Sequence, residues 1–209
     1  MFEKDSNNSG VMCDLFKLIP LTLEYCEQVY EIARECLPEH WSLDGIRDVL
    51  KYDNNIYYVA VLSQDKIYHE KVSGNYACVK VDEFGKADEP GKDDEPVKVD
   101  ESDKAGIMNI KLKTVIGFGG IMIVADEAEL LNIAVTEKYR GMNIASALMD
   151  RLIYEAKAKA CARMLLEVRH SNEVAQRLYK KKRFDELGVR KNYYDNPTED
   201  AIIMERKLL

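Results

Sequence analysis

The sequence lacks the features by which membrane-spanning and secreted chains are recognised. It has no run of about 18 apolar residues, the length from which a transmembrane helix is inferred. Residues 1–16 are polar and carry acidic side chains, so they do not follow the basic-then-apolar order of a signal peptide. We therefore expect a cytoplasmic protein that does not associate with membranes.

The sequence also lacks paired cysteines and metal-ligand spacings. Its five cysteines are odd in number, scattered and free of CxxC pairs: Cys13, Cys26, Cys36, Cys78 and Cys161. This pattern argues against a disulfide framework and a zinc site, and it favours a reducing compartment with buried thiols. The histidines His40, His69 and His170 show no metal-ligand spacing either, so we expect no bound metal.

The net charge of −7 is concentrated in one segment. From Lys80 the chain repeats a six-residue unit, roughly K-x-D-E-P/S-x, four times. Residues 80–104 hold ten Asp or Glu and five Lys, a net charge of −5, which leaves −2 for the rest of the chain. Such a composition buries too little apolar surface to offset its ordering entropy. We interpret residues 82–106 as a disordered loop insertion, with an acidic docking segment as the alternative, and we expect no direct binding of nucleic acid.

The remaining chain fits a single domain, because 209 residues with 46% hydrophobic side chains can bury one sizeable core. We assign residues 12–209 to this domain and residues 1–11 to a flexible N-terminus. Apolar residues at helical spacing from Leu23 to Leu37 predict an amphipathic helix that ends near Pro38. Ser42 is typical of the N-cap of a short second helix. Ile56–Leu62 then reads as a strand, with Lys71–Val81 as its expected partner.

The second half alternates strands and helices, which indicates an α/β fold around one central sheet. The expected strands are Val115–Val124, Glu129–Val135, Arg163–Val168, Phe184–Val189 and Ala201–Arg206. One expected helix begins at Ile144, and another covers Asn172–Lys182 with Val174, Ala175, Leu178 and Tyr179 inward. Residues 190–200 are expected to form a loop. Three glycines, Gly117, Gly119 and Gly120, predict a bulge or a close backbone approach.

The segment Arg140–Ala145 joins an expected strand to an expected helix. Unpaired N–H groups and the dipole at such a helix start favour an anion, and Arg140 adds a positive charge. Asn143 adopts a left-handed φ more readily than most residues. The segment has neither the GKS/T of a nucleotide P-loop nor the GxGxxG of a dinucleotide fold. From these residues alone, an ordinary helix N-terminus remains the alternative to a phosphate site.

Arg140–Ala145 resembles the Q/R-x-x-G-x-G/A acyl-CoA signature of the GCN5-related N-acetyltransferase (GNAT) superfamily. The motifs LNIAV, LLEVRHSNEVAQRLY, RKNYY and EDAIIM, between Leu130 and Met204, resemble its RimI-type ribosomal-protein-alanine N-acetyltransferases. The N-terminal half resembles this branch more loosely, chiefly through Trp41 and Ser42. The resemblance implies a single GNAT-like domain, with a mixed, mostly antiparallel central sheet flanked by helices and the acidic repeats as an insertion.

The resemblance also implies acetyl-CoA as co-substrate and a protein N-terminus as acceptor, in particular the N-terminal alanine of a small-subunit ribosomal protein. Glu167 would be the general base and Tyr179 the general acid. The implied coenzyme contacts are Ile133, Ala134 and Val135 for the pantetheine arm, Arg140, Gly141, Met142, Asn143, Ile144, Ala145 and Ser146 for the pyrophosphate, and Asn172. Trp41, Tyr193 and Tyr194 are candidates for the wall that receives the substrate.

Two positions depart from the family pattern, because Asn143 and Arg183 stand where glycine is usual. Without the resemblance, Glu167 would read as a solvated strand end and Tyr179 as a core residue. Two other functions stay open on the sequence. One is acetylation of a small amine or another peptide, and the other is a non-catalytic acetyl-CoA-binding module.

Overall fold

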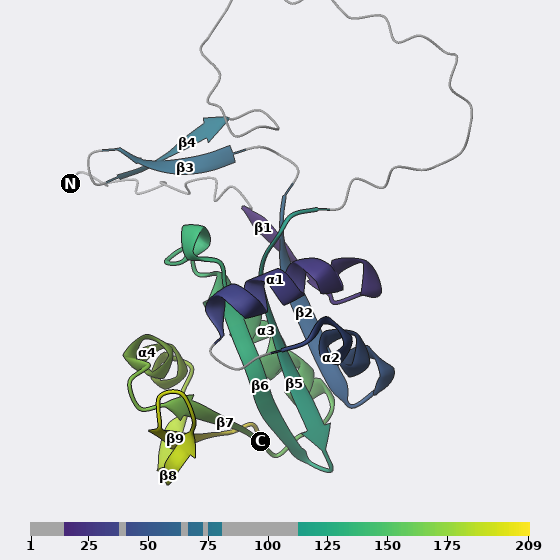
Figure 1. The fold of residues 1–209 in the computed structure, drawn as a ribbon, viewed down its shortest axis with the longest axis vertical. Helices are drawn as coiled ribbons and strands as arrows, with labels where there is room; N and C mark the ends of the chain where they lie inside the picture. The colour runs from purple at the N-terminus through teal and green to yellow at the C-terminus, as the bar shows by residue number, and fades with distance from the viewer. Residues whose placement is uncertain (1–14, 38–40, 64–66, 73–74, 81–112) are drawn as a thin grey trace, which may run out of the picture. The chain divides into compact units, whose positions relative to one another are not determined.

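Seven strands form one sheet in the order β1-β2-β5-β6-β7-β9-β8, seen in the computed structural model in Figure 1. Their bounds are β1 Phe16–Pro20, β2 Asn55–Leu62, β5 Val115–Val124, β6 Glu127–Val135, β7 Arg163–Arg169, β8 Asp185–Tyr194 and β9 Glu199–Lys207. Neighbouring strands are antiparallel except β6 and β7, which are parallel. The predicted mixed, mostly antiparallel sheet is thereby confirmed.

The structure describes residues 15–37, 41–63, 67–72, 75–80 and 113–209, with the backbone alone for 67–72 and 75–80. The chain divides into two compact units, Met1–Leu15 with Ser63–Lys111 and Phe16–Leu62 with Leu112–Leu209. The predicted N-terminal segment 1–11 and acidic insertion 82–106 lie outside the described residues. The seven-stranded sheet belongs entirely to the second unit.

The helices follow the predicted amphipathic patterns. They are α1 Cys26–Cys36, α2 Leu43–Asp48, α3 Ile144–Ala158 and α4 Glu173–Lys181, with short 3-10 turns η1 Leu23–Tyr25, η2 Val49–Lys51 and η3 Glu137–Tyr139. Ser42 caps α2 as expected, because its Oγ accepts a hydrogen bond from the Gly45 N–H at 3.0 Å. The inward face predicted for the last helix is wrong at Val174, which is 72% exposed.

Helices cover both faces of the sheet (Figure 1). Along β2 the side chains alternate, so that Val59 and Val61 join a core cluster with α1 on one face. On the other face lies α3, whose Leu152 Cδ1 would be 3.3 Å from a β-carbon at Gly119. A β-carbon at Gly117 would lie 2.9 Å from the backbone oxygen of Ala134, so the predicted close backbone approach is confirmed, and the predicted bulge occurs between Gly120 and Ile121 of the β5–β6 pair.

Two sequence predictions about pairing and loops are wrong. The segment Lys71–Val81 does not pair with β2, as far as it is described. Strands β3 (Ile67–Val72) and β4 (Asn75–Lys80) pair with each other in a separate two-stranded sheet, while β2 pairs with β5 and with β1. Strand β1 was not predicted, because a five-residue strand has too few positions for a clear alternation.

The second wrong prediction is the loop at residues 190–200. Most of these residues extend β8 to Tyr194 and begin β9 at Glu199. They are polar because β8 is an edge strand with both sides largely exposed, so apolar alternation is missing.

Among the described residues, no helix is long and apolar enough to cross a membrane. Of the predicted buried thiols, Cys26 and Cys161 are buried, and Cys36 is partly exposed.

Candidate functional site

The site begins where the two parallel strands separate. Strands β6 and β7 pair at Glu127–Arg163, Ala128–Met164 and Glu129–Leu165. Beyond that point the described strands share no pairs, although β6 continues to Val135 and β7 to Arg169. The gap opens into a cavity of about 850 Å³, within the range of small-molecule sites. We call this cavity the cleft.

The backbone of β6 presents polar groups to the cleft. Antiparallel pairs alternate between bonded and non-bonded positions, and Thr136 N donates to Ile116 O at 3.1 Å on the β5 side. Ala134, two residues earlier, therefore bonds toward β5 as well. The N–H and C=O groups of Ile133 and Val135 turn toward the cleft instead. Of the three predicted backbone contacts, Ile133 and Val135 can reach a ligand in this way, while Ala134 lines the cleft without a backbone group directed to it.

The loop from Arg140 to Ser146 closes one end of the cleft, and we call it the phosphate-binding loop. The first bond of α3 is Ala147 N to Asn143 O at 2.9 Å, so the preceding N–H groups of Ile144, Ala145 and Ser146 have no partner within the helix. The first turn contains no acidic residue, and Asn143 makes no capping bond with its side chain. This arrangement suits an anion.

Six of the seven predicted residues of this loop line the cleft, and Met142 does not. Gly141 has a φ of 80° and Asn143 a φ of 61°, both left-handed. The prediction that Asn143 occupies a left-handed position is therefore confirmed. Arg183, the other residue that replaces a family glycine, also has a left-handed φ of 63°. Both departures keep the backbone conformation that glycine would supply.

Glu167 lies on β7, where the strand borders the cleft, and its side chain is 18% exposed. Its Oε1 is 2.7 Å from Nη1 of Arg190, a residue of β8 that sequence reasoning did not single out. Hydrogen bonding to Glu167 is also the largest cause that raises the pKa of the Tyr193 phenol above its ordinary value. The Arg190 guanidinium is 5.0 Å from the centre of the Tyr193 ring. Glu167 therefore has two side-chain partners from one strand.

Tyr179 lies on α4, lines the cleft and is 5% exposed. Burial raises the pKa of its phenol far above the ordinary value, so the hydroxyl keeps its proton at neutral pH. Asn172, also at the cleft, caps α4, and its Oδ1 accepts from Ala175 N at 3.1 Å. The predicted substrate residues Trp41, Tyr193 and Tyr194 all line the same cleft.

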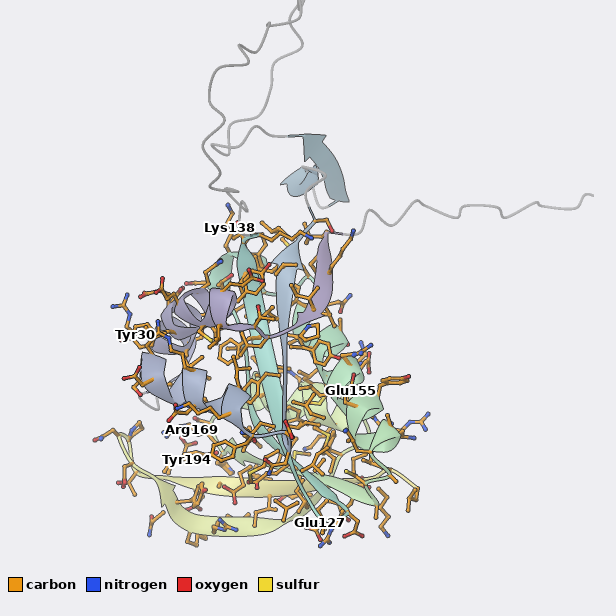
Figure 2. All side chains as sticks on the ribbon, turned by 90° about the vertical axis from the view of Figure 1, so that its right-hand side faces the viewer. Tyr30, Glu127, Lys138, Glu155, Arg169 and Tyr194 are labelled. Carbon is orange, nitrogen blue, oxygen red and sulfur yellow. The ribbon has the colours of Figure 1, made fainter. Side chains whose placement is uncertain are left out.

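The structure adds a contact that the sequence motifs did not reveal. Figure 2 shows Arg169 and Tyr194 side by side, with the guanidinium 4.2 Å from the ring centre. Arg169 also donates to the carbonyl oxygens of Asp195 and Pro197 in the β8–β9 turn. These bonds fix the turn against the end of β7. Within the described part of the chain, no group of three or more His, Cys, Asp or Glu is arranged to hold a metal ion.

The geometry agrees with a comparison of the sequence with protein-family models. Residues 75–184, more than half of the 209, match the acetyltransferase (GNAT) family. The chain belongs to this family. Its resemblance to the acyl-CoA signature is thus supported by a match over a much longer segment.

Curated relatives point to one branch of the family. A putative [ribosomal protein bS18]-alanine N-acetyltransferase of Bacillus subtilis is 46% identical over 88 residues, 42% of this chain and 58% of the relative. The [ribosomal protein bS18]-alanine N-acetyltransferase of Haemophilus influenzae is 41% identical over 103 residues, 46% and 70% of the two chains. That of Escherichia coli K12 is 43% identical over 89 residues, 42% and 60%. The chain thus spans less than two thirds of the length of two of these relatives.

Solved structures share the fold. The ribosomal-protein-S18-alanine N-acetyltransferase of Escherichia coli superposes with a TM-score of 0.64 at 22% identity, over 92% of this chain and 94% of that one. Ard1 of Thermoplasma volcanium gives 0.64 at 23% identity, over 93% and 99%. NAA60 of Arabidopsis thaliana, solved with a bisubstrate analogue, gives 0.64 at 18% identity, over 92% and 97%. At these identities the likeness establishes the fold.

Proposed function

We propose that this protein is an acetyl-CoA-dependent N-acetyltransferase that modifies the α-amine of a protein N-terminus. The observation that carries the proposal is that one cleft joins three parts. They are the phosphate-binding loop, the backbone edge of β6 beyond its pairs with β7, and the side chains of Glu167 and Tyr179. An anion site, an extended-chain site and a pair of proton-transfer groups are what an acyl-CoA-dependent transfer to an amine needs.

The polar groups that line the cleft have the chemistry needed to bind acetyl-CoA. The free N–H groups at the start of α3 and the charge of Arg140 would hold the pyrophosphate. The backbone groups of Ile133 would pair with the pantetheine arm, as an added strand does, and the N–H of Val135 would face the thioester end of the coenzyme. Asn172 would contribute a further contact from the start of α4. Bound acetyl-CoA would supply the acetyl group as an activated thioester.

Of the two proton-transfer groups, Glu167 would accept a proton and Tyr179 would donate one. Glu167 would accept the proton of the incoming amine, directly or through water, because its carboxylate borders the cleft. The backbone N–H of Val135 would polarise the thioester carbonyl. The amine nitrogen then bonds to the acetyl carbon as the carbon–sulfur bond breaks. Tyr179, whose phenol is protonated, would donate a proton to the departing sulfur.

For the substrate we propose the N-terminal alanine of a small-subunit ribosomal protein. The support comes from the names of the curated relatives, which specify alanine of ribosomal protein bS18. The aromatic side chains of Trp41, Tyr193 and Tyr194 border the cleft and would contact the first residues of an incoming chain.

The test is mass spectrometry of small-subunit ribosomal proteins incubated with the protein and acetyl-CoA. We expect a gain of one acetyl group on an N-terminal alanine, and none when that amine is chemically blocked beforehand. In the same assay Glu167→Gln and Tyr179→Phe should slow turnover with little change in acetyl-CoA affinity, which calorimetry measures.

The possible outcomes separate the candidate functions. Acetylation of a free polyamine but of no protein N-terminus would replace the peptide substrate by a small amine. Tight acetyl-CoA binding without any transfer would identify a binding module instead. Undetectable acetyl-CoA binding would overturn the proposal altogether.

A further inference from the structure

The Arg190 guanidinium lies 5.0 Å from the centre of the Tyr193 ring, although a regular strand would direct these two side chains to opposite faces. Side chains alternate along a strand, so residues three apart point to opposite faces. Strand β8 is not regular here. Arg190 pairs with Ala201 and Tyr194 with Glu199, which leaves three residues of β8 opposite one residue of β9. This bulge turns Tyr193 to the side on which Arg190 meets Glu167.

The single residue opposite the bulge is Asp200, and its side chain holds the bulge at two points. Oδ1 accepts from the backbone N–H of Asn192 at 2.9 Å. Oδ2 is 2.6 Å from Nζ of Lys191. Asn192 itself has a left-handed φ of 50°, so the backbone here is in a conformation that needs outside support. The Asp200 side chain supplies that support and is 24% exposed.

The bulge affects the surroundings of the Glu167 carboxylate. Arg190 Nη1 lies 2.7 Å from Oε1 of the carboxylate, and Tyr193 packs beside the Arg190 guanidinium, where hydrogen bonding to Glu167 raises the pKa of its phenol. Both residues come from the exposed edge strand of the sheet, where the Tyr193 ring packs edge-on against the Tyr194 ring at 5.0 Å between ring centres. A carboxylate has about four acceptor positions, so two partners restrict its orientation and leave room for a substrate amine or a water.

We infer that Asp200 is a positioning residue for Glu167: by pinning the β8 bulge, it places Arg190 and Tyr193 against the carboxylate. This inference rests on the proposed function, in which Glu167 is the general base. Asp200 does not line the cleft and touches no reacting group, so its effect is transmitted through Arg190 and Tyr193.

The first test is a double-mutant cycle on the full chain. Asp200→Ala should lower kcat for an alanine-initiated peptide about tenfold, since small misplacements of a catalytic group are costly, and should leave acetyl-CoA affinity unchanged. In a background of Arg190→Ala with Tyr193→Phe, the same substitution should cost less than about twofold, because its route to Glu167 is gone. Asp200→Asn keeps an acceptor for Asn192 N and should retain most of the rate. Asp185→Ala, an exposed acid at the other end of β8, is the matched control.

The second test does not depend on turnover. In the unchanged protein Tyr193 should titrate above the ordinary tyrosine pKa, because it hydrogen-bonds Glu167. In Asp200→Ala this titration should move down toward the ordinary value. Ultraviolet difference titration, with Tyr193→Phe to isolate this phenol, measures the shift.

The outcomes distinguish this inference from the proposed function. An equal loss of kcat in both backgrounds, or an unmoved Tyr193 titration, would show that Asp200 merely stabilises the hairpin and would overturn the inference. A normal rate in Asp200→Ala would do the same. If the unchanged protein transfers no acetyl group, the proposed function fails, and the positioning role for a base fails with it.

Discussion

The Nε of Arg140 donates a hydrogen bond to the carbonyl oxygen of Val135 at 3.1 Å. The bond joins the phosphate-binding loop to the end of β6, so the anion site and the backbone edge of the cleft are held together. The Arg140 Nη2 also lies 3.5 Å from Cys36 Sγ on α1. One side chain therefore sets the position of the loop and adds positive charge to it.

Arg140→Ala should weaken acetyl-CoA binding by about ten- to a hundredfold, because a hydrogen bond to a charged group contributes about 1.5–3 kcal/mol. Arg140→Lys should restore only part of the affinity, since an ammonium keeps the charge but not the planar set of donors. Isothermal calorimetry measures both. Arg34→Ala, which removes an exposed arginine of α1, is the control and should bind normally. Full affinity in Arg140→Lys would show that charge alone matters.

Asn143 and Arg183 both have a left-handed φ, but only Asn143 lines the cleft. Comparing them therefore separates the cost of this backbone conformation to stability from its effect on acetyl-CoA binding. Glycine avoids the strain of about 1 kcal/mol that other residues carry at positive φ. Arg183→Gly, away from the cleft, should raise the free energy of unfolding by about that amount. Asn143→Gly should preserve or tighten acetyl-CoA binding, and Asn143→Ala should weaken it. Denaturant titration and calorimetry measure the two quantities. Weaker binding in Asn143→Gly would indicate a direct side-chain contact instead.

The sequence predicted those parts of the site that depend on local rules. The bounds of β5, the cap at Ser42 and the left-handed position of Asn143 each follow from a few neighbouring residues. The cleft residues were identified through motif resemblance, and the structure brings all of them except Met142 to one cavity.

What the sequence did not predict depends on partners distant in the chain. The Arg190–Glu167 contact requires β9 to lie between β7 and β8, and strand order cannot be read from alternation. The β8 bulge was taken for a loop because its residues are polar, and in the structure Asn192 within it has a left-handed φ. Its cause, the Asp200 side chain, lies on the next strand. Edge strands with irregular backbones are therefore where sequence reasoning failed.

Gly120 should be among the least replaceable glycines of the sheet. A β-carbon at this position would lie 2.2 Å from Cε1 of Tyr57, whose ring covers the glycine. The ring is buried and cannot move aside freely, so Gly120→Ala should destabilise the fold by about 2–3 kcal/mol through overpacking. Gly188→Ala is the matched control, because nothing lies within 4 Å of its added carbon. Equal stability of the two variants by denaturant titration would contradict this account.

Tyr57 should also make stability depend on alkaline pH. Burial raises the pKa of its phenol to about 12, although its hydrogen bond with Asn132 acts in the opposite direction. In the unfolded chain the phenol titrates near pH 10. Between about pH 10 and 12 the unfolded state therefore binds fewer protons than the folded state, and the free energy of unfolding falls as pH rises.

Tyr57→Phe removes this contribution. At neutral pH the variant should be no more stable than the unchanged protein, because it loses the bond to Asn132. As pH rises from about 10 to 12, its free energy of unfolding should gain about 2–3 kcal/mol relative to the unchanged protein, from two pKa units at 1.36 kcal/mol each. Urea unfolding at a series of pH values measures the difference, with Tyr52→Phe, an exposed tyrosine, as control. A difference that stays constant across this range would show that the Tyr57 phenol ionises as readily in the folded protein as in the unfolded chain.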